Sequence, residues 1–146
     1  MECFPTECIS HSPEETEALG ERLARDLGPG SVIALRGGLG AGKTCLVKGI
    51  ARTLGINETI TSPTYTIVSE YTGGTYPLYH IDAYRLNGDE DFAQTGAEEL
   101  IESRSGISVI EWSERIPRSI PSGAITVEIA ISGPNSRLFT IQAGTQ

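Results

Sequence analysis

The stretch Gly37-Gly38-Leu39-Gly40-Ala41-Gly42-Lys43-Thr44 decides the fold, because it matches the phosphate-loop pattern GxxxxGK[ST] at every fixed position. Its glycines permit positive φ angles and a close approach of the backbone to a phosphate group. Successive backbone N–H groups and the start of a following helix attract the anion, and Lys43 adds a positive charge. The pattern predicts a site for the phosphates of a nucleotide.

The sequence on either side of this loop supplies the context that the pattern requires. The apolar run at residues 32–35 is typical of a short buried strand. After the loop, Leu46, Ile50 and Leu54 recur every four residues and predict an amphipathic helix that begins near Lys43 and stops at Gly55. A chance glycine-rich turn is therefore the weaker interpretation.

A helix is also predicted upstream of the loop. Ser12 can cap it, Pro13 suits its first position, and Glu15 falls three residues after the cap. The apolar face consists of leucines spaced four apart, Leu19, Leu23 and Leu27. The Gly-Pro-Gly sequence at residues 28–30 is expected to end this helix.

The remaining segments add strands to this β/α unit. Residues 2–10 contain a possible edge strand, residues 65–71 and 76–81 form a hairpin around Gly73-Gly74, and residues 107–110 form a buried strand. Residues 87–104 have some helical character, residues 115–123 read as a loop, and residues 124–131 and 137–143 read as a final pair of strands. We predict a single domain over residues 1–146, a three-layer α/β fold of the P-loop NTPase type with a mixed parallel and antiparallel sheet.

Composition excludes several classes of protein. The 146 residues carry a net charge of -8, which disfavours unaided non-specific nucleic-acid binding. Three cysteines without CxxC spacing, Cys3, Cys8 and Cys45, disfavour a disulfide framework or a zinc cluster. The absence of a long apolar run and of a signal-peptide pattern predicts a cytoplasmic protein with no membrane association.

Two acids follow apolar strands downstream of the loop. Asp82 comes after the strand at 76–81, and Glu111 comes after the strand at 107–110. A phosphate loop needs such an acid to hold Mg²⁺ or its water, while Thr44 offers a hydroxyl to the metal. A single acid at a strand end is a turn residue about as often as it is a functional one. Two such acids downstream of a phosphate loop favour function. Which of the two ligates Mg²⁺ directly stays open.

Further polar residues near these motifs allow two interpretations each. Hydroxyl groups at residues 61–66 could reach the γ-phosphate or could belong to an ordinary strand entry, and spacing alone favours the strand entry. His80 shares a strand face with Asp82, and spacing alone favours a satisfied structural histidine over one that orients the acid. Trp112 could cover the site or fill the core. No guanine-recognising Asn-Lys-x-Asp sequence occurs, which favours ATP over GTP.

Four ordered motifs together resemble the TsaE family, also called YjeE. They are GGLGAGKT at 37–44, SPTYTIV at 62–68, YHIDAYRL at 79–86 and IEW at 110–112, and the similarity extends from Ser12 to about Arg137. The resemblance implies a bacterial ATPase in the biosynthesis of N6-threonylcarbamoyladenosine at position 37 of tRNA. It implies that the protein acts with TsaB and TsaD, which stimulate its ATP hydrolysis, and that it meets tRNA through that complex.

The resemblance also implies roles for individual residues. Lys43, Asp82 and Glu111 become catalytic, and Thr44, Asp82 and Glu111 become the Mg²⁺ site. The ATP-binding set comprises Gly37, Gly38, Leu39, Gly40, Ala41, Gly42, Lys43, Thr44, Cys45, Thr16, Thr64 and Arg137. Gly38 and Cys45 depart from the residues common in the family, an acid and a second hydroxyl. A small-molecule kinase and an ATP-dependent assembly module are the alternative functions.

Overall fold

The computed structural model describes residues 7–37, 42–60 and 67–144, in which seven strands form one sheet in the order β1-β7-β6-β2-β5-β4-β3. The strands are β1 (Glu7–Ser10), β2 (Val32–Arg36), β3 (Val68–Tyr71), β4 (Leu78–Asp82), β5 (Ile107–Glu111), β6 (Ile125–Gly133) and β7 (Ser136–Gln142). The central pairs, β6–β2, β2–β5 and β5–β4, are parallel, whereas β1–β7, β7–β6 and β4–β3 are antiparallel. The predicted mixed sheet is confirmed.

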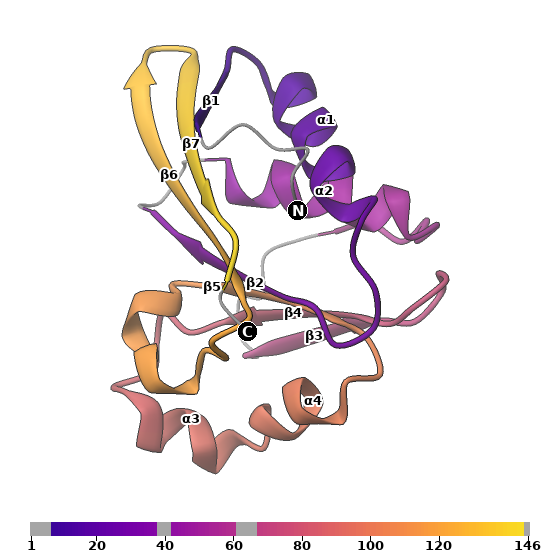
Figure 1. Cartoon of the computed structure of the whole chain (residues 1–146), viewed down its shortest axis with the longest axis vertical. Coiled ribbons are helices and arrows are strands. Elements are labelled where there is room, and N and C mark those ends of the chain that lie inside the picture. Colours follow the sequence, from indigo (N-terminus) through magenta and orange to yellow (C-terminus); the bar gives the residue numbers. More distant parts are fainter. Residues whose placement is uncertain (1–6, 38–41, 61–66, 145–146) are drawn as a thin grey trace.

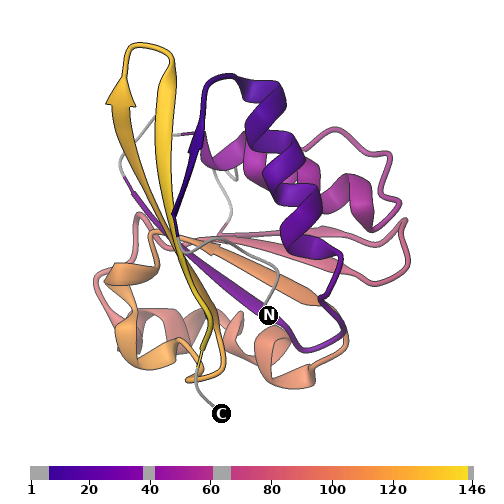
Figure 2. The same cartoon turned by 45° about the horizontal axis from the view of Figure 1, so that its top comes forward.

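Helices cover both faces of this sheet (Figures 1 and 2). The helices are α1 (Pro13–Ala24), α2 (Lys43–Thr53), α3 (Asp89–Thr95) and α4 (Glu98–Ser103), with two 3₁₀ turns, η1 (Ser113–Arg115) and η2 (Pro117–Ser119). Side chains alternate along β5, so that Val109 joins the core under α1 and α2 while Ile110 joins the core above α3 and α4. The three-layer α/β prediction is therefore confirmed.

Glycines bring α1 and α2 into backbone contact. A Cβ atom added at Gly20 would lie 2.2 Å from the carbonyl oxygen of Leu46, and one added at Gly49 would lie 1.9 Å from that of Glu17. Neither position can hold a side chain without separating the helices. The contact fixes α2, which follows the phosphate loop, against α1.

The ends of some elements differ from the prediction. The predicted cap is confirmed, since Ser12 Oγ accepts from the Glu15 N–H at 3.1 Å, but α1 ends at Ala24 because a turn forms there, with the N–H of Leu27 bonded to the Ala24 carbonyl. The predicted loop at 115–123 contains η2, which begins at Pro117; proline suits this first helical position because the N–H that it lacks would have no partner within the helix. In the described part of the chain, no helix is long and apolar enough to span a membrane.

Candidate functional site

The phosphate loop joins the end of β2 to the start of α2. Gly37 has φ +149° and Gly42 has φ +92°, and a Cβ atom on Gly37 would lie 2.6 Å from the Ile129 carbonyl oxygen. Both positions therefore need glycine. The predicted ATP-binding residues Gly38, Leu39, Gly40, Ala41 and Thr64, and the segment at 61–66, lie outside the described residues.

Lys43 is buried at the first position of α2, with 5% of its surface exposed. Its ammonium donates to the Gly37 carbonyl at 2.8 Å and lies 4.2 Å from the centre of the Trp112 ring. Burial lowers the pKa of Lys43, and the negative charges of Glu111, Glu114 and Asp82 oppose that shift. The cation thus sits between the loop and the acids.

The two predicted acids lie side by side at the carboxyl ends of adjacent parallel strands. Asp82 on β4 pairs in register with Glu111 on β5, and Val109 lies two residues before Glu111. Because alternate residues of a strand share a face, both acids stand on the face that α1 and α2 cover. The sheet therefore brings Asp82 and Glu111 to the same face as Lys43.

The surroundings of the two carboxyls differ. Glu111 is buried, with 4% of its surface exposed, and its backbone carbonyl accepts from the Ala83 N–H at 3.0 Å. Asp82 is half-buried, and its Oδ1 accepts from the Tyr84 N–H at 3.0 Å. Burial raises the pKa of Asp82; the Tyr84 N–H opposes the shift and the charge of Glu111 adds to it.

These residues fit a magnesium ion that shares its coordination with phosphate. Mg²⁺ prefers oxygen ligands and usually takes one or two carboxylates together with substrate phosphates and water. Asp82 and Glu111 would supply the carboxylates, and Thr44, second in α2, would supply a hydroxyl. Among the residues described, no group of three His, Cys, Asp or Glu side chains is placed to hold a metal. The donor set fits a metal that arrives with a nucleotide.

His80 lies two residues before Asp82 on β4 and is fully buried. Its Nε2 contacts Oε2 of Glu111, and its Nδ1 has no hydrogen-bond partner among the described groups. The interpretation that spacing favoured, a satisfied structural histidine, holds for Nε2 but not for Nδ1. The interaction with Glu111 crosses from β4 to β5, so that no local sequence signal could reveal it.

Trp112 follows Glu111 with the left-handed backbone angle φ +58°. Such a conformation costs a non-glycine residue about 1 kcal/mol and is often found at functional sites. The ring lies 4.9 Å from that of Tyr84, and the guanidinium of Arg115 lies 5.1 Å from the Tyr84 ring and 5.8 Å from the Trp112 ring. With Lys43 over its ring, Trp112 borders the site, and sequence reasoning missed Tyr84 and Arg115 as its neighbours.

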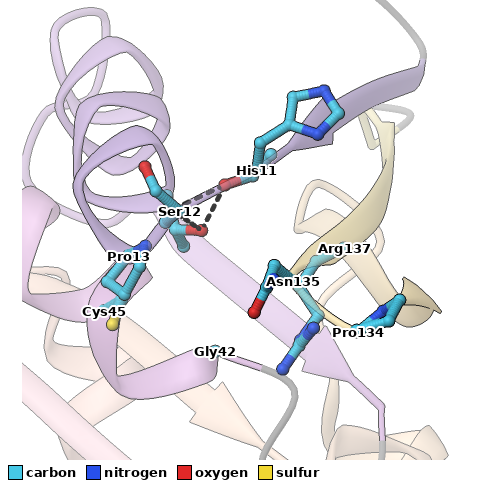
Figure 3. A pocket seen from close by; sticks show the side chains of 10 residues that line it. His11, Ser12, Pro13, Gly42, Cys45, Pro134, Asn135 and Arg137 are labelled. Carbon is cyan, nitrogen blue, oxygen red and sulfur yellow. Dashed lines mark hydrogen bonds between the residues drawn. The ribbon is translucent and has the colours of Figure 1, made fainter.

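A pocket of about 350 Å³ opens beside the start of α2 (Figure 3). It is lined by Ser10, His11, Ser12, Pro13, Thr16, Gly42, Cys45, Pro134, Asn135 and Arg137. The guanidinium of Arg137 points from β7 toward Gly42. Thr16 is buried at the pocket wall, and its hydroxyl lies 2.7 Å from Ser10 Oγ. The structure thus brings Thr16, Cys45 and Arg137 together; His11, Ser12 and Asn135 were missed, because loop residues carry no periodic pattern.

We expect Asp82→Asn to raise the melting temperature at pH 7 by about 2 °C while it impairs the site. The raised pKa means that the folded protein holds a proton on Asp82 more tightly than the unfolded chain does. This carboxyl therefore makes stability fall as pH rises from its ordinary pKa of 3.8 through the raised value, and the penalty persists at neutral pH. Asparagine removes the charge and retains Oδ1 for Tyr84.

Thermal unfolding of both proteins at pH 7 and near pH 3.5 measures this effect. The gain should shrink at the lower pH, where the Asp82 carboxyl is mostly protonated in both states. A variant that melts at or below the wild-type temperature at pH 7 contradicts the assigned cost of burying Asp82.

Comparison with known proteins places this arrangement in a family. Residues 10–139 match the family model described as Threonylcarbamoyl adenosine biosynthesis protein TsaE. Two proteins named tRNA threonylcarbamoyladenosine biosynthesis protein TsaE are similar to this chain. The protein of Treponema pallidum (strain Nichols) is 43% identical, over 92% of this chain and 98% of its own length. The protein of Nostoc sp. (strain PCC 7120) is 48% identical, over 85% of this chain and 77% of its own length. The crystal structure of Bacillus subtilis YdiB superposes with a TM-score of 0.82 at 34% identity, covering 95% of this chain and 85% of that one. The chain therefore belongs to the TsaE family.

Proposed function

We propose that this protein binds ATP with Mg²⁺ and hydrolyses it as a component of tRNA threonylcarbamoyladenosine biosynthesis. The observation that carries the proposal is the position of Lys43 beside two carboxyls, Asp82 and Glu111, that are paired in register at adjacent strand ends. A buried cation at the start of the helix after a phosphate loop, together with two acids at neighbouring strand ends, matches the needs of phosphoryl transfer to water.

In this proposal the phosphate loop and the pocket bind different parts of the nucleotide. We place the phosphates at the start of α2, where backbone N–H groups and Lys43 attract negative charge. The nucleoside then occupies the pocket, with Thr16 and Cys45 at its walls and Arg137 at its edge. A volume of about 350 Å³ lies within the range of sites for small molecules.

The side chains have distinct tasks in this proposal. When bound, Mg²⁺ would neutralise charge on the β- and γ-phosphates. Thr44, Asp82 and Glu111 would hold it or its water, and a carboxylate would orient the attacking water. Lys43 would release the Gly37 carbonyl and turn to the phosphates. Trp112 would limit the access of bulk water on that side of Lys43.

The biological context comes from the relatives' names. Those proteins are named for tRNA threonylcarbamoyladenosine biosynthesis, and we propose the same pathway for this chain, in the cytoplasm. We propose TsaB and TsaD as its partners, with tRNA reached through them. The net charge of -8 supports an indirect route to tRNA, since an acidic surface repels the phosphate backbone.

Phosphate release from ATP, measured with and without TsaB and TsaD, tests the proposal. We expect slow Mg²⁺-dependent release by the protein alone and release at least about 10-fold faster with both partners, within the range of regulated P-loop hydrolases. EDTA and a Lys43→Met variant are the controls. Release no faster than that of the Lys43 variant, with partners present, would refute the function. Phosphoryl transfer to a metabolite would indicate a kinase instead.

A further inference from the structure

We infer that His80 is a positioning residue that holds the Glu111 carboxylate in the orientation required for Mg²⁺ or its water. The inference rests on the proposed function, because it needs Glu111 to serve the metal. His80 comes from β4 and Glu111 from β5, and Oε2 of Glu111 meets Nε2 of His80 in the interior. One oxygen is thereby occupied by the histidine, and Oε1 is left for the site.

The proposed role of Glu111 as a metal ligand requires an ionised carboxylate, and this requirement defines the donor of the hydrogen bond. An ionised carboxylate only accepts, so that Nε2 of His80 must carry the proton and donate it. The ring itself cannot swing away, since His80 is fully buried in the sheet next to Val109, its register partner on β5. A glutamate has three side-chain torsions, and a bond to a fixed donor restricts them before the metal arrives.

The second ring nitrogen, Nδ1, indicates that packing alone does not explain why a histidine stands at position 80. Nδ1 is buried and makes no hydrogen bond within the described residues. Leaving a buried polar atom unpaired is unfavourable, and an apolar side chain would fill the same space without that loss. The imidazole therefore contributes through Nε2, which contacts Glu111.

A matched pair of substitutions tests this role. Glutamine places its Nε2 the same number of bonds from Cα as the Nε2 of histidine, whereas methionine has a similar length and no donor. We expect His80→Met to weaken Mn²⁺ binding in the presence of a non-hydrolysable ATP analogue by about 10–100-fold, the usual effect of losing a residue that orients a metal ligand. His80→Gln should stay within about threefold of wild type, because it restores the donor.

Three comparisons distinguish a positioning role of His80 from a general loss of folded structure. Affinity for ATP without metal should change by less than about twofold in His80→Met, since Lys43 and the loop are untouched. On a Glu111→Gln background, His80→Met should add little to the loss of Mn²⁺ affinity, because the two residues act through one contact. Thermal unfolding should show both His80 variants folded. If His80→Met does not fold, His80→Asn replaces it: its amide lies one bond short of Glu111 and should also lose Mn²⁺ affinity.

The outcomes distinguish a failure of the positioning role of His80 from a failure of the proposed ATPase function. Equal losses of Mn²⁺ affinity in the methionine and glutamine variants, or wild-type affinity in both, would overturn the positioning role while leaving the ATPase intact. A wild-type protein that binds neither ATP nor Mn²⁺ with the analogue would overturn the proposed function itself.

Discussion

Replacing Lys43 with methionine is expected to reduce Mg²⁺-dependent ATP hydrolysis by more than about 100-fold, the scale of losing one donor aimed at transition-state charge. The ammonium is the buried cation at the start of α2, and burial strengthens its interaction with phosphate. Methionine keeps the length and the apolar stem beside Trp112 but brings no charge to the phosphates. ATP affinity should fall as well, by about 10-fold, the value of one charge-assisted hydrogen bond.

Tryptophan fluorescence reports this binding directly. Trp112 is the single tryptophan of the chain, and the Lys43 ammonium lies over its ring. ATP should change the emission of the wild-type protein when Lys43 moves to the phosphates, and it should change that of Lys43→Met far less. Lys48→Met is the matched control, since Lys48 is exposed on the same helix. Equal hydrolysis by the Lys43 and Lys48 variants would contradict the assigned site.

Gly49→Ala is expected to lower the free energy of unfolding by about 3 kcal/mol, at the upper end of the usual cost of overpacking. Its new methyl group would stand 1.9 Å from the Glu17 carbonyl oxygen, and that contact is with backbone, which no rotamer change can relieve. The helices α1 and α2 would have to separate, with loss of packing along both. For a chain of this length we expect the melting temperature to fall by about 10 °C.

Gly28→Ala is the control for this experiment. Gly28 lies in the turn after α1, and a Cβ atom there would meet nothing within 4 Å. Its melting temperature should change by no more than about 2 °C, as for most surface substitutions. Chemical unfolding monitored by circular dichroism gives both free energies. Similar stability of the two variants would show that α1 and α2 can separate at little cost.

The elements of the fold that follow from local sequence were predictable, and the order of the strands was not. Ser12 caps α1 and Lys43 opens α2 as their neighbours in the sequence require. The order β1-β7-β6-β2-β5-β4-β3 depends on contacts between distant segments, such as Glu7 with Thr140. Apolar runs indicate that a strand is buried but do not name its partner.

The same division applies to the site. Lys43, Asp82 and Glu111 stand out because a motif or a strand end marks them. The pairing of His80 with Glu111 depends on the register of β4 against β5, which one sequence does not define. The left-handed backbone conformation of Trp112 could not be predicted from the sequence either, because non-glycine residues adopt it only where tertiary contacts impose it.

The pairing of β1 with β7 has a consequence for how the protein is made on the ribosome. Ser10 and Thr16 leave the exit tunnel early, whereas Arg137 leaves it only with β7, and all three line one pocket. Synthesis at about 5–20 residues per second leaves β1 without its neighbour for several seconds. The nascent chain can form α1 and α2 during that interval, but the pocket that we propose for the nucleoside is completed last. We therefore expect a ribosome-bound fragment to lack the complete pocket until β7 has left the exit tunnel.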